Sequence, residues 1–245
     1  MAYKLWDIRR SFGGLEVLSG VDIEFGPTQL LVILGPSGCG KTTLLKIVAG
    51  LDGGFSGKRE GFDQSRFSFV FQEHRLLPWK SVVGNALFAL SSAGMDKSQA
   101  MTRIENFVRL SGLSGHENRP VRELSGGMRQ RAALVRAFAM PADILLLDEA
   151  FQSVDLKRKR ELMRLFLGLR EMERNASILV THDPWEALWL ADRIVVLSDR
   201  PTRVVDAFDI DLPRGEREAG MPAIAALEMR LSAALIGIET SPPPC

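Results

Sequence analysis

The chain has 245 residues, 46% of them hydrophobic, which is enough to fill the core of a large α/β domain. Its 31 Lys and Arg residues almost balance its 30 Asp and Glu residues, and this near-zero net charge argues against nucleic acid as a partner. Because no apolar run approaches the roughly 20 residues of a membrane span and the N-terminus lacks the pattern of a signal peptide, we expect a cytoplasmic protein.

The first predicted elements are two half-exposed antiparallel strands at residues 4–8 and 21–25, where polar and apolar side chains partly alternate. Gly13-Gly14 between them favours a turn. A third predicted strand, residues 30–34, is apolar throughout, as in strands that are buried on both faces. We therefore expect an antiparallel pair that covers one edge of a more deeply buried sheet.

A glycine-rich loop follows the third strand and leads into a predicted helix. The residues of this loop are Gly35, Pro36, Ser37, Gly38, Cys39, Gly40, Lys41, Thr42 and Thr43. They match G-x-x-x-x-G-K-[ST], a pattern in which backbone N–H groups surround phosphates, the lysine pairs with β and γ oxygens and the hydroxyl beside it holds Mg²⁺. The alternative is an ordinary glycine turn between a strand and a helix.

Residues 81–139 are predicted to be mostly helical, because their apolar side chains recur at helical spacing. Gln72 precedes this region and follows a strand-like segment. Near its end, Ser125, Gly126 and Gly127 come directly before a predicted helix at residues 128–138. Two glycines at a helix start expose backbone N–H groups at the positive end of the dipole, which suits an anion brought by another surface.

Three later runs are apolar without interruption, at residues 144–147, 177–180 and 194–197. They predict strands of a parallel sheet, in which ligands gather at the carboxyl ends. Gly35, Asp148-Glu149 and His182 each follow such a strand closely, so we expect one surface to collect them. Beyond the sheet, residues 221–236 predict one terminal amphipathic helix.

Residues 3–213 resemble an ATP-binding cassette subunit, the ATPase half of an ABC transporter. The resemblance rests on four motifs that occur in the order of that family: the glycine-lysine loop, the Leu-Ser-Gly-Gly sequence, Leu147-Asp148-Glu149 and Thr181-His182-Asp183. The resemblance implies an α/β fold: a P-loop NTPase core with a mostly parallel sheet, an antiparallel N-terminal β subdomain and an inserted α-helical subdomain. It implies a single ATPase domain at residues 1–214, with the helical subdomain at about 78–140, then a short helix and a frayed tail at 215–245.

The resemblance also implies roles for single residues, with ATP and Mg²⁺ as the bound groups. Lys41 would pair with the phosphates, and Glu149 would polarise the attacking water. His182 would sense the γ-phosphate. Mg²⁺ would be held by Thr42, Gln72 and Asp148. Asp148 would either bind the ion directly or contact one of its ligands. Taken alone, His182 is more often a structural cap and Gln72 an ordinary polar residue.

Further implied contacts lie outside the phosphate loop. Phe12 would stack on adenine, with ordinary edge packing as the alternative. Ser125, Gly126 and Gly127 would face the γ-phosphate bound to a second copy, and Asp155 would cross the seam of that homodimer. Two departures from the family pattern stand out, because Ala150 replaces the usual proline after the glutamate and Met128 replaces a frequent glutamine.

The segment from Gln72 to Trp79, with its Leu-Leu-Pro-Trp sequence, looks like that of importers of nitrate, sulfonate and taurine. This likeness implies integral-membrane permease subunits as partners, an extracytoplasmic solute-binding protein as an indirect one, and a position on the inner face of the cell membrane. Trp79 would line the groove that receives the permease, or else belong to the core of the helical lobe. The alternative function is an ABC ATPase that drives or regulates a membrane partner without moving solute.

Overall fold

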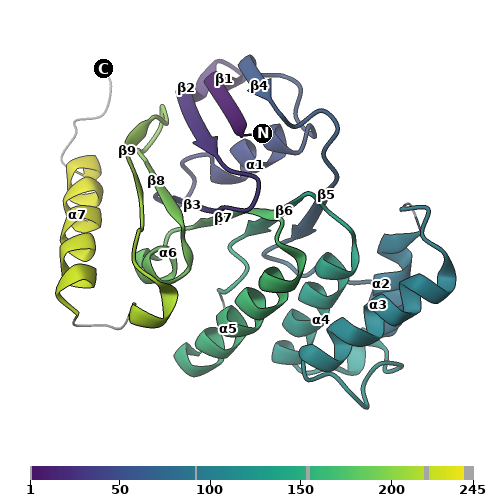
Figure 1. Cartoon of the computed structure of the whole chain (residues 1–245). Coiled ribbons are helices and arrows are strands. Elements are labelled where there is room, and N and C mark those ends of the chain that lie inside the picture. Colours follow the sequence, from purple (N-terminus) through teal and green to yellow (C-terminus); the bar gives the residue numbers. More distant parts are fainter. Residues whose placement is uncertain (1, 92, 153–154, 218–220, 240–245) are drawn as a thin grey trace. The chain divides into compact units, whose positions relative to one another are not determined.

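The computed structural model describes residues 2–91, 93–152, 155–217 and 221–239. The chain forms two compact units, one made of residues up to 65 together with residues from 176 onwards, and the other of residues 66–175 (Figure 1). The tail predicted to fray, residues 241–245, lies outside the described residues.

The first unit contains a three-stranded antiparallel sheet in the order β2-β1-β4. Its strands are β1 (Tyr3–Phe12), β2 (Leu15–Phe25) and β4 (Ser56–Glu60). Gly13 and Gly14 form the turn between β1 and β2 with φ of 54° and 87°, a backbone region that glycine enters at little cost. The predicted antiparallel N-terminal sheet is confirmed, with longer strands than the sequence pattern indicated.

The second sheet of this unit is mostly parallel and holds its core. β3 (Leu30–Leu34) pairs in parallel with β7 (Ala176–Thr181) on one side and with β8 (Arg193–Leu197) on the other, and β9 (Val204–Asp209) is antiparallel to β8. Every residue of β3 and β7 is buried, as the unbroken apolar runs predicted. The helices α1 (Lys41–Val48) and α6 (Pro184–Leu190) contact these strands.

The C-terminal helix α7 (Pro222–Glu239) packs on α6 and β8 and buries Ile224 and Leu231. A short 3₁₀ turn, η2 (Arg214–Glu216), precedes it. The next residue, Arg217, donates hydrogen bonds to the carbonyls of Leu188 and Ala191 at 3.1 and 2.6 Å. Arg217 thereby satisfies carbonyl groups at the end of α6, which have no partner within the helix itself.

The second unit pairs β5 (Phe67–Val70) with β6 (Ile144–Asp148) in parallel and carries most of the helices. These are α2 (Val82–Leu90), α3 (Lys97–Leu110), η1 (Val121–Glu123), α4 (Gly126–Ala139) and α5 (Leu156–Glu173). α4 contacts α2, α3, α5 and β5, and its small buried alanines allow this close packing (Figure 1). The predicted helical region is therefore confirmed.

A chain of aromatic rings ties these helices together. Phe138 on α4 lies 6.1 Å from Phe107 on α3 and 6.0 Å from Phe166 on α5, measured between ring centroids. Arg103 on α3 adds hydrogen bonds to the carbonyls of Phe138 and Ala139 at 3.0 and 2.7 Å. The carboxyl end of α4 is therefore fixed to α3 through both apolar and polar contacts.

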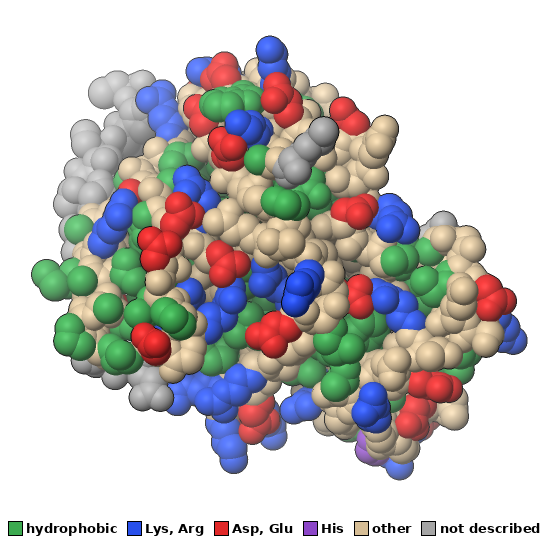
Figure 2. All heavy atoms as spheres, viewed as in Figure 1, with side chains coloured by type: hydrophobic (Ala, Val, Ile, Leu, Met, Phe, Trp, Pro, Cys, Tyr) green, Lys and Arg blue, Asp and Glu red, His purple; other side chains and the backbone are tan. Residues whose placement is uncertain are grey.

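Every helix in the described part of the chain is too short or too polar to span a bilayer. On the face that Figure 2 shows, acidic and basic side chains are interspersed, in keeping with the net charge of +1.

Candidate functional site

The glycine-lysine loop links the carboxyl end of β3 to the first turn of α1. Two of its glycines, Gly38 and Gly40, have φ of 79° and 116°. A Cβ on Gly40 would lie 2.8 Å from Cγ1 of Val17 and 3.1 Å from Cδ2 of Leu18, both on β2. Glycine is thus required at position 40 by the backbone conformation and by the packing of this unit.

Lys41 begins α1 and lies inside the loop that precedes it. Its Nζ donates to the carbonyl oxygens of Gly35 and Pro36, both at 2.7 Å, and the residue is only 5% exposed. The next residue, Thr42, is exposed on the first helical turn. The loop therefore holds an ammonium group and a hydroxyl next to the amino end of a helix, which is a favourable setting for phosphate.

Cys39 is a buried residue of the loop. Its side chain is 1% exposed, and burial raises the pKa of its thiol despite the nearby Lys41 ammonium. The hydroxyl of Thr202 donates to the Cys39 carbonyl. Any contribution of Cys39 to phosphate binding would come from its backbone, because its side chain belongs to the core.

His182 lies at the same sheet edge as the loop. Leu34 pairs with Thr181 across β3 and β7, and the N–H of Gly35 donates to the carbonyl of Thr181 at 3.3 Å. His182 is exposed, and it is followed by Asp183, which caps α6 by accepting from the N–H groups of Trp185 and Glu186. The cap of α6 is therefore Asp183, and His182 is left at the surface beside the loop.

Phe12 ends β1 and is 45% exposed, too much for a core residue. The Cζ of Arg10 lies over its ring, 4.0 Å from the centroid. The sequence pattern that singled out Phe12 gave no signal for Arg10.

The acidic residues lie in the second unit, at the carboxyl end of its strand pair. Val70 pairs with Leu147, so the segment with Gln72 and the segment with Asp148 and Glu149 leave the same edge of β5 and β6. Gln72 is exposed and the two acids are half-buried. Oxygen ligands of this kind suit Mg²⁺, which is usually held by one or two carboxylates together with substrate phosphates.

Glu149 has a φ of 48°, in the left-handed region that residues with a Cβ rarely occupy. The following two residues are buried, Ala150 at 8% exposure and Phe151 at 0%, and the Phe151 ring packs edge-on against Phe166 at 5.6 Å. These buried neighbours keep Glu149 in a conformation that costs about 1–3 kcal/mol, a kind of strain that concentrates at functional sites. Ala150 stands where the family usually has proline, so the segment of residues 149–151 is fixed by the burial of Ala150 and Phe151.

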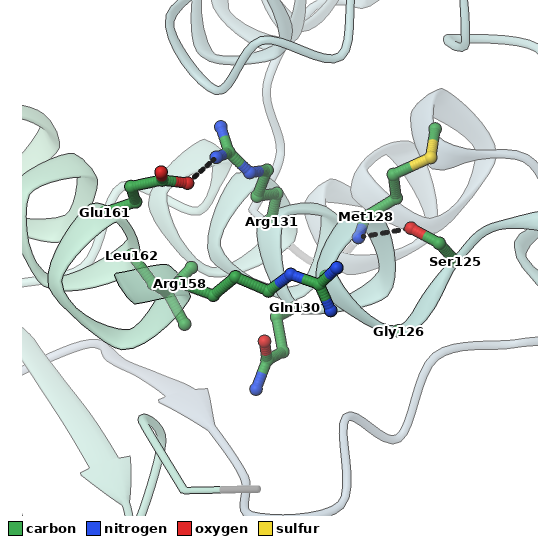
Figure 3. Close-up of a pocket in the computed structure, with 9 residues that line it drawn as sticks. Ser125, Gly126, Met128, Gln130, Arg131, Arg158, Glu161 and Leu162 are labelled. Carbon is green, nitrogen blue, oxygen red and sulfur yellow. Dashed lines mark hydrogen bonds and ion pairs between the residues drawn. The ribbon is translucent and has the colours of Figure 1, made fainter. Parts of the chain in front are cut away.

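The Ser-Gly-Gly sequence forms the start of α4 and opens onto a pocket of about 230 Å³ (Figure 3). The Ser125 hydroxyl caps the helix by accepting from the Met128 N–H at 3.3 Å, so α4 begins at Gly126 and not at Met128 as predicted. Arg158 from α5 extends across the pocket toward this end of α4 in Figure 3, and Arg131 forms an ion pair with Glu161 at 3.6 Å.

The backbone conformation and packing that require glycine at position 40 do not apply to Gly126 and Gly127. Neither has a positive φ, and a Cβ on either would meet no atom within 4 Å among the described residues. The contacts of the described chain therefore do not account for glycine at these two positions.

Polar contacts also hold the segment after β6 and the start of α5. Nε2 of Gln130, a residue only 7% exposed, donates to the carbonyl of Gln152, three residues after Glu149, at 3.2 Å. Asp155 caps α5 by accepting from the N–H of Arg158 at 3.1 Å and pairs with the Arg158 side chain at 3.3 Å. Its neighbours Ser153 and Val154 lie outside the described residues.

Trp79 is 67% exposed, which excludes the alternative that it belongs to the core of the helical lobe. The loop that carries it is nonetheless well fixed, because the buried Asn85 amide accepts from the Leu77 N–H at 2.8 Å and donates to the Leu77 carbonyl at 3.1 Å. Asn85 was not singled out from the sequence. A lone amide within the apolar run of α2 could have indicated a buried hydrogen-bonding residue.

The residues predicted for the site thus fall into two groups. The first unit brings together the glycine-lysine loop and His182 at one sheet edge and carries Phe12. The second brings Gln72 to the same strand edge as Asp148 and Glu149, and it carries Ser125, Gly126, Gly127 and Asp155.

Comparisons with known proteins identify the family of the chain. The family model described as ABC transporter matches residues 18–152. An aliphatic sulfonates import ATP-binding protein of Burkholderia cenocepacia is 39% identical over 91% of this chain and 83% of its own. One from Nocardia farcinica is 41% identical over 96% and 90%, and an uncharacterised ABC transporter ATP-binding protein of Methanocaldococcus jannaschii is 36% identical over 88% and 82%.

Among solved structures, a chain of an ABC transporter assigned to the metal-chelate type, in an inward-facing conformation, superposes with a TM-score of 0.74. It covers 85% of this chain and 83% of its own at 22% identity, a likeness that supports the fold. The α/β P-loop fold predicted from the sequence is confirmed. With the matched family model and these relatives, the chain belongs to the ABC transporter family, as one of its ATP-binding, ATP-hydrolysing subunits.

Proposed function

We propose that this subunit energises the import of a small solute of the sulfonate, nitrate or taurine type through a partner permease. The observation that carries the proposal is that one chain contains both a complete phosphate-binding loop and a strained glutamate at a strand end. Relatives of this chain are named as sulfonate import ATP-binding proteins. The solute itself would be selected by the permease and an extracytoplasmic binding protein.

In the proposed mechanism, the loop from Gly35 to Thr43 binds the triphosphate. Lys41 exchanges its loop carbonyl partners for β and γ oxygens, and His182 contacts the γ-phosphate from the neighbouring strand end. Thr42, Gln72 and Asp148 would hold Mg²⁺, which when bound neutralises charge that develops on the phosphates. Glu149 orients the attacking water and accepts its proton.

We further propose that two copies share each triphosphate. The open start of α4 supports this, because Gly126 and Gly127 leave room that the described residues do not use and line a pocket at the amino end of the helix, the end that attracts anions. The γ-phosphate held by the loop of one copy would lie against this turn in the other, with Asp155 near the seam. ATP would then join the copies, and its hydrolysis would release them.

The exposed Trp79 and Phe88, at 67% and 59%, offer an apolar surface for the permease at the inner face of the membrane. Because the Asn85 amide fixes the loop before α2, this surface is ordered before binding, which lowers the cost of association.

The test is reconstitution with the permease and binding protein in vesicles. We expect ATP hydrolysis to rise when solute is added outside, and labelled solute to accumulate. Stimulated hydrolysis without any solute movement would instead support the regulatory alternative. No ATP hydrolysis by the complex or by the isolated subunit would overturn the proposal.

A further inference from the structure

Arg10 on β1 is fixed by three partners, and two of them are far from it in the sequence. Its Nε donates to Oδ2 of Asp52 at 3.1 Å, and its Nη1 donates to the carbonyls of Gly54 and Ser11 at 2.8 and 3.0 Å. The arginine side chain is 19% exposed and the Asp52 side chain 12%. Such an arginine is far more restricted than an ordinary surface cation.

Asp52 is itself held in place. Its Oδ1 accepts from the Gly54 N–H at 2.9 Å, which closes a short turn around the carboxylate. Burial would raise the pKa of Asp52, but the hydrogen bonds from Gly54 and Arg10 outweigh it and keep the pKa below its usual value. The ion pair with Arg10 is therefore intact at neutral pH.

This fixed guanidinium covers one face of Phe12, with its Cζ 4.0 Å from the ring centroid. A planar cation at this distance interacts favourably with the ring and restricts its rotation. Because Phe12 remains 45% exposed, the ring still offers surface to a ligand.

We propose that Arg10 is a positioning residue for the nucleotide base: it backs one face of Phe12 and leaves the other face for adenine. This inference rests on the proposed role of Phe12 in ATP binding. Arg10 itself touches no part of the nucleotide, and its effect is to hold the ring in the orientation that stacking requires. It should therefore affect ligands that carry a base and spare ligands that carry only phosphates.

The chain offers a matched pair of variants for the test. A Cβ on Gly54 would lie 2.6 Å from Nη1 and 2.7 Å from Cζ of Arg10, so Gly54→Ala must displace the guanidinium. A Cβ on the adjacent Gly53 would meet no atom within 4 Å in the described part of the chain. Gly53→Ala thus alters the same turn without touching Arg10.

The experiment measures the Kd of Mg-ATP and of Mg-tripolyphosphate for the full chain, with KM and kcat for ATP hydrolysis. We expect Arg10→Ala and Gly54→Ala each to raise the Kd and KM for ATP about 3- to 10-fold, the range expected when one side chain loses its pre-organisation. The Kd of tripolyphosphate and kcat should stay within twofold, and Gly53→Ala should match the wild type. Arg10→Ala should add nothing to Phe12→Ala in the double variant.

If Phe12→Ala weakens ATP binding while Arg10→Ala and Gly54→Ala leave it unchanged, the inference is wrong and the role of Phe12 stands. Equal losses for ATP and tripolyphosphate in Arg10→Ala and Gly54→Ala would also overturn it, because they would indicate a general disturbance of the fold. If the wild type binds neither ligand, the proposed function itself fails.

Discussion

Glycines in this chain serve two different purposes, and the residue-level contacts distinguish them. At Gly40 the positive φ and the contacts with Val17 and Leu18 exclude any side chain. At Gly126 and Gly127 the described residues leave space for one. The first glycine is therefore needed for folding, and we assign the other two to contact with a partner-bound phosphate.

Gly40→Ala should destabilise the protein by about 1–3 kcal/mol, because a Cβ would overlap the side chain of Val17 in a closely packed region. The measurement is the free energy of unfolding in urea. A variant as stable as the wild type would show that the loop adjusts without cost.

Gly126→Ala should leave the free energy of unfolding within about 0.5 kcal/mol of the wild type, since the added methyl group meets open space. It should nevertheless lower the ATPase rate at least tenfold, about 1.4 kcal/mol, because the methyl group would occupy the space proposed for the γ-phosphate of the second copy. Full activity in a stably folded variant would argue against that contact.

At the level of elements, the loop before α2 joins a buried polar anchor to an exposed apolar tip. Asn85 satisfies the backbone of Leu77, and Val121 donates to the Lys80 carbonyl at 3.0 Å, so Trp79 is presented on an ordered segment. The exposed Trp79 ring on this ordered loop is the surface that we propose for the permease.

Trp79→Ala should leave stability and the ATPase rate of the isolated subunit near the wild-type values, because the side chain is 67% exposed. In the reconstituted complex it should abolish solute-stimulated hydrolysis and weaken co-purification with the permease. Wild-type transport by this variant would exclude Trp79 from the permease interface.

We expect the ion pair between α7 and β9 to make a pH-dependent contribution to stability. Arg230 donates to both carboxylate oxygens of Asp206 at 2.7 Å, and these hydrogen bonds hold the pKa of Asp206 below its usual value. A carboxyl group with a lowered folded-state pKa contributes stability above its unfolded pKa of about 3.9 and loses it as the pH falls through the folded value.

Asp206→Asn should therefore lower the free energy of unfolding by about 0.2–1 kcal/mol at pH 7, a range that reflects the solvent exposure of the pair. The difference from the wild type should shrink as the pH falls below 3.9 and the wild-type carboxyl group becomes protonated. Arg230→Gln should give the same loss, and the double variant no more. A deficit that persists unchanged at low pH would assign the effect to something other than the ion pair.

How far the sequence predicts these elements depends on how local their determinants are. The strands β3, β6, β7 and β8 follow from unbroken apolar runs, and the glycine-lysine loop follows from its own pattern. The start of α4 was misplaced by two residues because the Ser125 cap draws Gly126 into the helix.

Contacts between distant residues could not be predicted in this way. Arg10 donates a hydrogen bond to Gly54, 44 residues away in the sequence, and Gln130 donates one to Gln152, 22 residues away. The positive φ of Glu149 depends on the burial of Phe151 against α5, which a single sequence does not reveal.

For the whole molecule, we propose that two copies close around shared ATP, with the loop of one copy and the start of α4 of the other on the same triphosphate. The two groups of site residues occur in separate units of the fold, and neither group contains both the phosphate-binding loop and the acidic residues. The loop supplies the Lys41 ammonium group, whereas the second unit supplies Asp148 and Glu149.

The most direct measurement is the mass of Glu149→Gln by light scattering with saturating Mg-ATP. Under the role that we propose for Glu149, this variant should bind ATP without hydrolysing it. We therefore expect the mass of two chains with ATP, of one chain with ADP, and of one chain with ATP when Gly126→Ala is added. If Glu149→Gln keeps the mass of a single chain at saturating Mg-ATP, even with the permease present, the shared-nucleotide account is contradicted.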